Sequence, residues 1–206
     1  MSKVFVSVGL SLDGFIAGSN RGPQNPLGDG GREIHGWAFR QKAFLQRLNL
    51  PGGEEGRDGE IVAATFDRIG ANIMGRRMFN EGEASWPEDA PFRTPVYVLT
   101  SSPRDPWQRP GGTTFYFETG GIRPALEKAK AAAGKKDVRI SGGAHAIRQY
   151  LSAGLVDELH IQLAPVVLGS GLRLFDYIDP DTFSLTIEDV VASPLTTHLQ
   201  YRVSGR

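Results

Sequence analysis

Two adjacent glycines separate a predicted strand from a predicted helix in the C-terminal half of the chain. Residues 138–140 are apolar, and after the glycines apolar residues return with helical spacing from Ala144 onward. Gly142 and Gly143 let the backbone turn sharply and come close to a ligand, and the first N–H groups of the helix are unpaired and partly positive. Such a junction suits a phosphate. Two tight structural turns in an α/β sheet are the alternative interpretation.

Two further predicted strands end in residue types that bind phosphate. The strand at 71–74 runs into Gly75, Arg76 and Arg77, which places two guanidiniums at the start of a helix. The strand beginning at Val96 ends in three hydroxyl side chains: Thr100, Ser101 and Ser102. Open α/β sheets bind ligands at the ends of their strands, so these residues are candidates for a shared site. A solvated pair of charges is the alternative for the two arginines.

Four residues are the candidates for contact with a reacting substrate. Asp13 follows the first strand and could relay a proton or orient a substrate, but it could equally be a turn residue that holds its own backbone before Gly14. Glu33, His35 and Trp37 come where a long loop, 19–32, enters a helix. Trp37 could stack on a flat substrate or simply be a buried aromatic residue.

Strands and helices alternate along most of the chain, which indicates an α/β fold. Strands are expected near 4–10, 71–74, 96–100, 115–117, 138–140 and 158–168, and helices near 36–48, 60–69, 122–133 and 144–151. Two further strands, 184–191 and 196–203, form a terminal hairpin without a helix. The sheet is therefore expected to be mixed, parallel in its body and antiparallel at one end. No linker divides the sequence, so we expect one domain over 1–206.

Composition excludes several classes of function. Lys plus Arg equals Asp plus Glu at 23 each, so no overall field attracts nucleic acid or an anionic membrane. Cysteine is absent, and the four histidines share no ligand spacing, so no metal is expected. The N-terminal stretch alternates like a strand and no apolar run is long enough to span a bilayer, which favours a cytoplasmic protein. The dinucleotide fingerprint G-x-G-x-x-G, the P-loop and the G-x-S-x-G elbow are also missing.

Five motifs together resemble the dihydrofolate reductase-like fold, and within it the reductase domain of riboflavin biosynthesis. In chain order they are SLDGFIAG, MGRRMF, VYVLTSSP, SGGAHAIRQYL and APVVLGSG, and they span nearly the whole sequence. The resemblance implies a three-layer fold with helices on both faces of the sheet. It also implies NADPH as cofactor, with a pyrophosphate at the glycine pair and the adenosine phosphate at the other two strand ends. The residues implied for the cofactor are Leu12, Gly75, Arg76, Arg77, Thr100, Ser101, Ser102, Gly142, Gly143, Ala144 and Ile147.

Two departures narrow this expectation. Dihydrofolate reductases carry a carboxylate on the helix after the first loop, but residues 34–53 contain no Asp or Glu, which disfavours folate reduction. The bifunctional riboflavin enzymes add a zinc deaminase, for which this chain has neither cysteines nor room. The chain thus resembles the stand-alone members of the family.

The resulting hypothesis is an NADPH-dependent reductase that delivers hydride to a carbonyl or imine carbon of a small heterocyclic or sugar-like substrate. A binding protein that keeps the dinucleotide pocket without turnover is the rival interpretation. A hydrolase is disfavoured because no nucleophile and base pair is recognisable. Members of the family are commonly homodimers, so a dimer through the C-terminal part of the sheet is expected.

Overall fold

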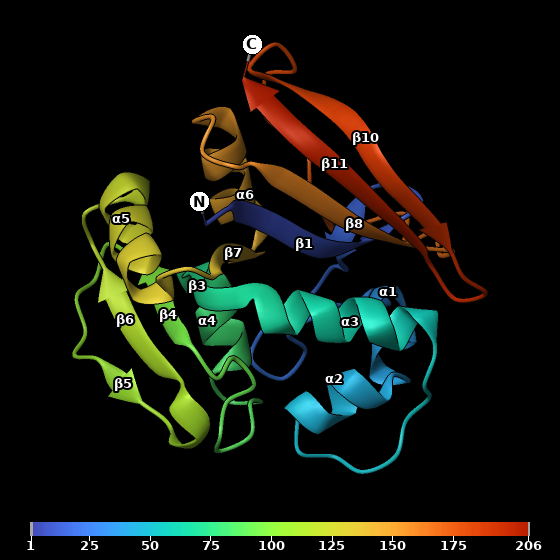
Figure 1. The fold of residues 1–206 in the computed structure, drawn as a ribbon, viewed down its shortest axis with the longest axis horizontal. Helices are drawn as coiled ribbons and strands as arrows, with labels where there is room; N and C mark the ends of the chain where they lie inside the picture. The colour runs from blue at the N-terminus through green and yellow to red at the C-terminus, as the bar shows by residue number, and fades with distance from the viewer. Residues whose placement is uncertain (1, 206) are drawn as a thin grey trace.

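A nine-stranded sheet forms the centre of the fold, and the computed structural model describes residues 2–205 (Figure 1). In spatial order the strands are β10 (Phe183–Ala192), β11 (Thr197–Gly205), β8 (Glu158–Ala164), β1 (Val4–Ser11), β7 (Asp137–Gly142), β3 (Ile69–Gly75), β4 (Pro95–Leu99), β6 (Thr114–Glu118) and β5 (Trp107–Gln108). Strands β8 to β6 are parallel, whereas β5, β11 and β10 pair antiparallel with their neighbours. The predicted mixed sheet with a C-terminal hairpin is confirmed.

Helices cover both faces of this sheet, so the fold has three layers. One face carries α5 (Ile122–Ala133) and α6 (Ala144–Ser152). The other carries α1 (Gly31–Phe39), α2 (Lys42–Arg47), α3 (Arg57–Arg68) and α4 (Arg76–Gly82). A small second sheet pairs β2 (Phe15–Ala17) with β9 (Leu172–Arg173), and a 3₁₀ turn, η1, spans Pro110–Gly112.

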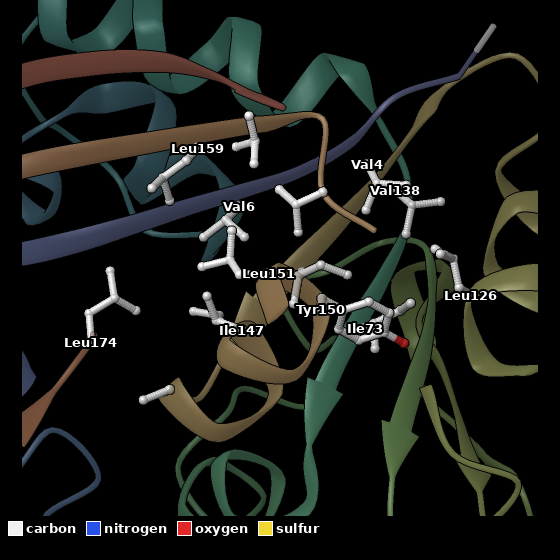
Figure 2. Close-up of a cluster of buried hydrophobic side chains, with 14 of the residues drawn as sticks. Val4, Val6, Ile73, Leu126, Val138, Ile147, Tyr150, Leu151, Leu159 and Leu174 are labelled. Carbon is white, nitrogen blue, oxygen red and sulfur yellow. The ribbon is translucent and has the colours of Figure 1, made fainter. Parts of the chain in front are cut away.

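The main core lies between the sheet and helices α5 and α6. Alternate residues of the central strands, among them Val6, Ile73 and Val138, point to this side and are fully buried (Figure 2). Ile147 and Leu151 of α6 meet them from the helix side. Because apolar surface is removed from water along the whole length of the strands, this layer fixes their positions.

The opposite face of the same strands is polar near its centre. In the parallel register Phe5 pairs with Arg139, and Asn72 pairs with Arg139 on its other side, so all three side chains share one face. Ser7 and Ser141 lie on this face too. The sheet is therefore apolar toward α5 and α6 and partly polar toward α1 to α3.

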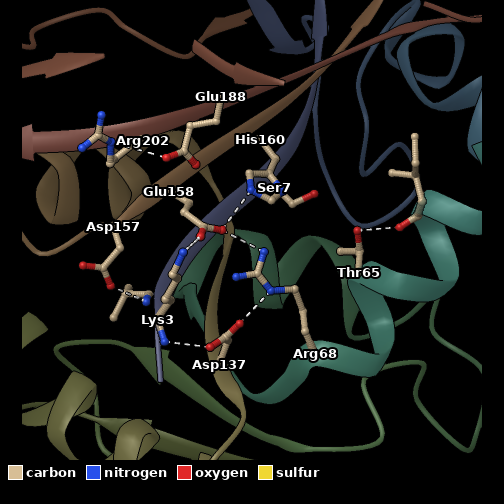
Figure 3. A network of polar contacts seen from close by, with 12 residues as sticks. Lys3, Ser7, Thr65, Arg68, Asp137, Asp157, Glu158, His160, Glu188 and Arg202 are labelled. Carbon is tan, nitrogen blue, oxygen red and sulfur yellow. Dashed lines mark hydrogen bonds and ion pairs between the residues drawn. The ribbon is translucent and has the colours of Figure 1, made fainter. Parts of the chain in front are cut away.

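A charged network closes the edge of the sheet where the parallel strands begin (Figure 3). Arg68 at the end of α3 donates from Nε to Asp137 Oδ2 at 2.7 Å and from Nη1 to Glu158 Oε2 at 2.8 Å. Its guanidinium also lies 4.2 Å from the ring centroid of Phe5. Hydrogen bonds from His160, Lys3 and Arg68 hold the pKa of Glu158 well below its usual range. This network joins α3 to strands β7 and β8.

Two predicted elements differ most from the structure. The single helix expected at 36–48 is two helices, α1 and α2, because Gln41 is extended between them and residues 40–42 pair with Glu54 instead. The helix after the first loop also starts earlier, at Gly31, so it includes Glu33. The strand expected at 158–168 ends at Ala164, directly before Pro165, which has no N–H for a ladder.

Candidate active site

A cavity of about 870 Å³ runs along the edge of the sheet where the parallel strands end and continues beneath α1, α2 and α3. It is lined by glycine turns, hydroxyls and arginines at the strand ends and by aromatic residues further in. Of the predicted residues it brings together His35, Trp37, Gly75, Arg76, Arg77, Thr100, Ser101, Gly142, Gly143 and Ala144. The strand-end residues expected to share one site therefore line one cavity, with the exception of Ser102.

The glycine pair forms part of the cavity wall at the start of α6. Gly142 has φ +135°, a conformation that favours glycine, and a Cβ built on it would lie 2.9 Å from Met78 Sδ. A Cβ on Gly143 would meet no protein atom within 4 Å, and its φ of −71° suits any residue. The peptide bond between them is cis. Gly143 thus leaves space that belongs to the cavity rather than to the protein core.

Arg76 and Arg77 differ in how much of their hydrogen bonding the protein satisfies. Arg76 donates from Nε to Asn80 Oδ1 at 2.8 Å, but its Nη1 is buried and has no hydrogen-bond partner among the described residues. The Arg77 side chain is 72% exposed and pairs with Glu81 at 3.1 Å. A buried donor without a partner is costly, so Arg76 is the better candidate for an anion.

His35 lies beneath β1, where Gly9 makes room for its ring. A Cβ on Gly9 would lie 3.1 Å from His35 Nδ1. Burial, and next the positive charge of Arg139, lower the pKa of His35 to about 4, so the imidazole is neutral at pH 7. Trp37 also borders the cavity, and its ring stands edge-on to His198 with 5.0 Å between centroids. It is a buried aromatic residue, 9% exposed, and its Nε1 has no partner in the described part of the chain.

The predicted residues that do not border the cavity are Leu12, Asp13, Glu33, Ser102 and Ile147. Leu12 is 58% exposed at the turn after β1, and Ile147 belongs to the core on the other face of the sheet. Ser102 lies past the strand end and donates its backbone N–H to Thr100 Oγ1 at 3.0 Å. Glu33 is exposed in the first turn of α1, so the helix is not free of acid, but its carboxyl lies outside the cavity.

Asp13, the leading candidate for proton relay, lies outside the cavity lining and forms a latch, a set of hydrogen bonds that joins two loops. Its carboxylate accepts hydrogen bonds from Ser11 Oγ at 2.6 Å and from the backbone N–H groups of Leu168 and Gly169 at 3.1 and 2.7 Å. These hydrogen bonds, that of Ser11 foremost, lower its pKa to about 2. The interpretation as a turn residue therefore fits the structure better, although its loop partner lies far along the sequence.

Sequence reasoning missed the polar residues that line the cavity from the middle of the sheet. They are Ser7, Asn72, Arg139, Ser141 and Gln162, joined by Arg47 from α2. The signal was present in the alternation of Val138, Arg139, Ile140 and Ser141, because a charged residue inside a central strand must meet something polar. The apolar residues of this stretch alone predict only an apolar strand before the glycine turn.

The described residues hold no cluster of His, Cys, Asp or Glu able to ligate a metal ion. Among the helices of residues 2–205, none combines the length and the apolar character that crossing a membrane requires.

Comparisons with known proteins agree with the order of these elements. The profile of the RibD C-terminal domain family matches residues 2–200. Two uncharacterized proteins of Bacillus subtilis (strain 168) are each 28% identical: YwjB over 128 residues, 62% of this chain and 71% of its own, and YyaP over 144 residues, 62% and 76%. A crystal structure from Shewanella sp. PV-4, described as that of a candidate riboflavin biosynthesis protein, superposes with a TM-score of 0.66. It is 22% identical and covers 98% of this chain and 99% of that one. The chain thus has the fold of a reductase domain, and it belongs to the RibD C-terminal domain family.

Proposed function

We propose that this protein is an NADPH-dependent reductase that transfers hydride to the carbon of a C=O or C=N bond in a small heterocyclic or ribosylamino substrate. The observation that carries the proposal is the wall of the cavity at the strand ends. There Gly143 leaves open space at the start of α6, and Arg76 presents a buried donor that has no partner within residues 2–205. A pyrophosphate and a further phosphate are the groups that such a wall accommodates.

Each part of the wall would have a separate task. Gly142, Gly143 and Ala144 would hold the pyrophosphate on backbone N–H groups at the start of α6, and Arg76 with Thr100 and Ser101 would hold the adenosine phosphate. NADPH, when bound, supplies the hydride. The interior beneath α1 to α3 would place the substrate carbon against it and exclude bulk water.

His35 would orient the substrate by a hydrogen bond rather than act as an acid. Its lowered pKa, about 4, leaves it neutral at pH 7, so it carries one N–H donor and one acceptor nitrogen. The carboxyl groups that line the cavity, Glu81 and Glu118, form ion pairs with Arg77 and Lys128. We therefore propose that the proton that completes the reduction comes from water: the C=O or C=N carbon gains hydride, and the O or N gains the proton.

Because both carboxyl groups that line the cavity, Glu81 and Glu118, are held in ion pairs, a second candidate is also favoured: a protein that binds NADP(H) without catalytic turnover. A spectrum separates the two. If NADPH binds to the chain but no pterin, pyrimidine or other carbonyl compound oxidises it, the binding protein is the better description.

The Arg76→Ala variant tests whether Arg76 binds the adenosine phosphate of NADPH. A charge-assisted hydrogen bond contributes roughly 1.5 to 3 kcal/mol, so Arg76→Ala should weaken NADPH binding by about tenfold to a hundredfold. NADH lacks the adenosine ribose phosphate and should be nearly unaffected. Fluorescence titrations of both cofactors on wild type and variant measure this difference.

Arg77→Ala is the matched control, because this side chain is exposed and already paired with Glu81, and its effect should be smaller. Equal loss for both cofactors in Arg76→Ala would mean that the arginine supports the fold. No loss for either would place the phosphate elsewhere.

A further inference from the structure

The part of the cavity beneath α1 to α3 has an aromatic wall and a positive charge. Phe39 and Phe44 lie with ring centroids 5.4 Å apart, and Phe66 lies 6.1 Å from Phe44. The guanidinium of Arg47 lies 5.0 Å from the centroid of Phe66. Arg139 enters the same space from strand β7. We call this region, bounded by Phe39, Phe44, Phe66, Arg47 and Arg139, the inner chamber.

Arg139 is a part-buried cation with no anionic partner in residues 2–205. Its Nη2 donates to the backbone oxygen of Ser7 at 2.9 Å, while Nε is buried and has no partner in residues 2–205. Burial, and next the positive charge of Arg47, lower its pKa to about 10, so it remains charged at pH 7. Removing a guanidinium from water without a counter-ion costs several kcal/mol. A site that keeps such a charge is suited to an anion supplied from outside.

Among the described residues, no carboxylate forms an ion pair with Arg139 or with its neighbour Arg47. Arg47 donates from Nε to the oxygen of Pro91 at 2.6 Å and from Nη2 to the oxygen of Phe92, so it too meets carbonyls rather than carboxylates. The cavity as a whole is lined by five arginines and two glutamates, although the whole chain has a formal net charge of zero. Glu81 pairs with two of these arginines, Arg77 and Arg21, and Glu118 pairs with Lys128. Among the described residues, Arg47, Arg76 and Arg139 therefore have no carboxylate partner. Positive charge is thus concentrated in the cavity.

We propose that the inner chamber is a substrate subsite that binds a carboxylate on a flat, apolar body, with Arg139 as the residue that takes the carboxylate. The inference rests on the proposed function only in calling the ligand a substrate. A guanidinium can donate two parallel N–H bonds to one carboxylate, and the neighbouring rings match a planar body. One guanidinium balances one charge, and Nε and Nη2 of the nearby Arg47 already donate to backbone oxygens, which favours a monoanion over a phosphate dianion.

Three probes with one ring system test this subsite: 2-naphthoate, the neutral 2-naphthamide and 2-naphthyl phosphate. Binding is measured on NADPH-saturated protein by titration calorimetry. We expect wild type to prefer naphthoate over naphthamide by about tenfold to a hundredfold. Arg139→Met should remove this preference while leaving NADPH affinity unchanged. Arg76→Ala should weaken NADPH binding and leave the preference for naphthoate over naphthamide intact.

Stability distinguishes a binding role from a structural one. Replacing an unpaired buried charge by an apolar chain of similar length should leave the urea midpoint of Arg139→Met unchanged or higher. If the arginine served the fold through Ser7, the midpoint would fall. Arg139→Lys is the second variant, since it keeps the charge but loses the fork. It should retain some acid preference and bind naphthoate several-fold more weakly than wild type.

Several outcomes would overturn the proposal. Equal binding of acid and amide by wild type, or a preference that survives Arg139→Met, would remove Arg139 from the subsite. Displacement of naphthoate by NADPH would place the probe at the cofactor's phosphate site, and tighter binding of the naphthyl phosphate would exclude a carboxylate site. A chain that fails to bind NADPH but keeps an Arg139-dependent acid preference without it would contradict the reductase proposal and leave the subsite standing.

Discussion

Individual residues at the strand ends differ in whether the protein's own backbone and packing require them. Gly142 is required by the backbone, because its φ of +135° and the nearby Met78 leave no room for a side chain. Gly143 has an ordinary φ and open space where a side chain would be. The two neighbouring glycines therefore differ: the backbone and Met78 require the first, whereas no contact among the described residues requires the second.

Gly143→Val follows from this difference. The side chain should enter the cavity without disturbing the fold, and it should reduce NADPH affinity by on the order of a hundredfold or more, because it fills the space beside the first N–H groups of α6. Fluorescence titration measures the affinity, and circular dichroism checks the fold. Gly142→Val is the contrasting variant and should destabilise the protein. Unchanged affinity in a folded Gly143→Val protein would make the turn purely structural.

At the scale of elements, the loop between β8 and β9 depends on its attachment to the turn after β1. The carboxylate of Asp13 accepts hydrogen bonds from two backbone N–H groups of this loop. Leu12 donates its own N–H to Val166 O at 2.8 Å, and Arg173 Nη1 donates to Asp13 O at 2.7 Å. These hydrogen bonds hold the irregular backbone of the loop in place, although the loop is not part of a β-sheet.

The latch should open at low pH. The folded-state pKa of Asp13, about 2, lies below its unfolded value of 3.8, so its stabilising effect is complete above about pH 4 and is lost as the pH falls toward 2. The amide proton shift of Gly169, followed by NMR, should stay constant from pH 7 to 5 and change below pH 4. Asp13→Ala should show the low-pH shift already at pH 7 and still bind NADPH. Loss of turnover with intact binding in this variant would instead support the relay role.

The sequence predicted elements well where local pattern decides the outcome. Helix α5 has the predicted bounds, Ile122–Ala133, and the hairpin of β10 and β11 lies within two residues of its prediction. The prediction from the sequence failed at residues 40–42, where pairing with Glu54 across a loop overrides a continuous helical pattern. For the site, glycine and hydroxyl turns were visible because their chemistry is local. The roles of Asp13 and Arg139 were not, because each depends on a partner more than a hundred residues away.

At the scale of the whole molecule, the exposed edge of the sheet is apolar. Leu185, Ile187 and Val190 of β10 are 40%, 64% and 51% exposed. The register shifts between Ile187 and Asp189, and this extra residue brings Val190 to the same face as the other two. In the C-terminal part of the sheet, where a dimer contact is expected, β8 and β11 each lie between two strands and β10 is the edge strand.

We expect a homodimer formed through this face of β10. An exposed apolar edge strand favours association with a second copy, and burying it removes apolar surface from water. Sedimentation at micromolar concentration should give about twice the 22.4 kDa of one chain. Ile187→Glu should give monomers, whereas Thr186→Glu, on the opposite face of the same strand, should not. A monomeric wild type would contradict the prediction.

The unpaired N–H groups of the cavity give the molecule a property that can be used before its substrate is known. Arg76 Nη1, Arg139 Nε and Trp37 Nε1 are buried without partners among the described residues, so any ligand that satisfies them favours the folded state. A ligand at a hundred times its Kd stabilises by about 2.7 kcal/mol, which raises the Tm of a chain this size by roughly 5 to 10 °C. Thermal melting of the NADPH-saturated protein against a metabolite library therefore becomes a direct search for the substrate. Arg139→Met supplies the matched protein in which compounds that bind through the inner chamber should no longer raise the Tm.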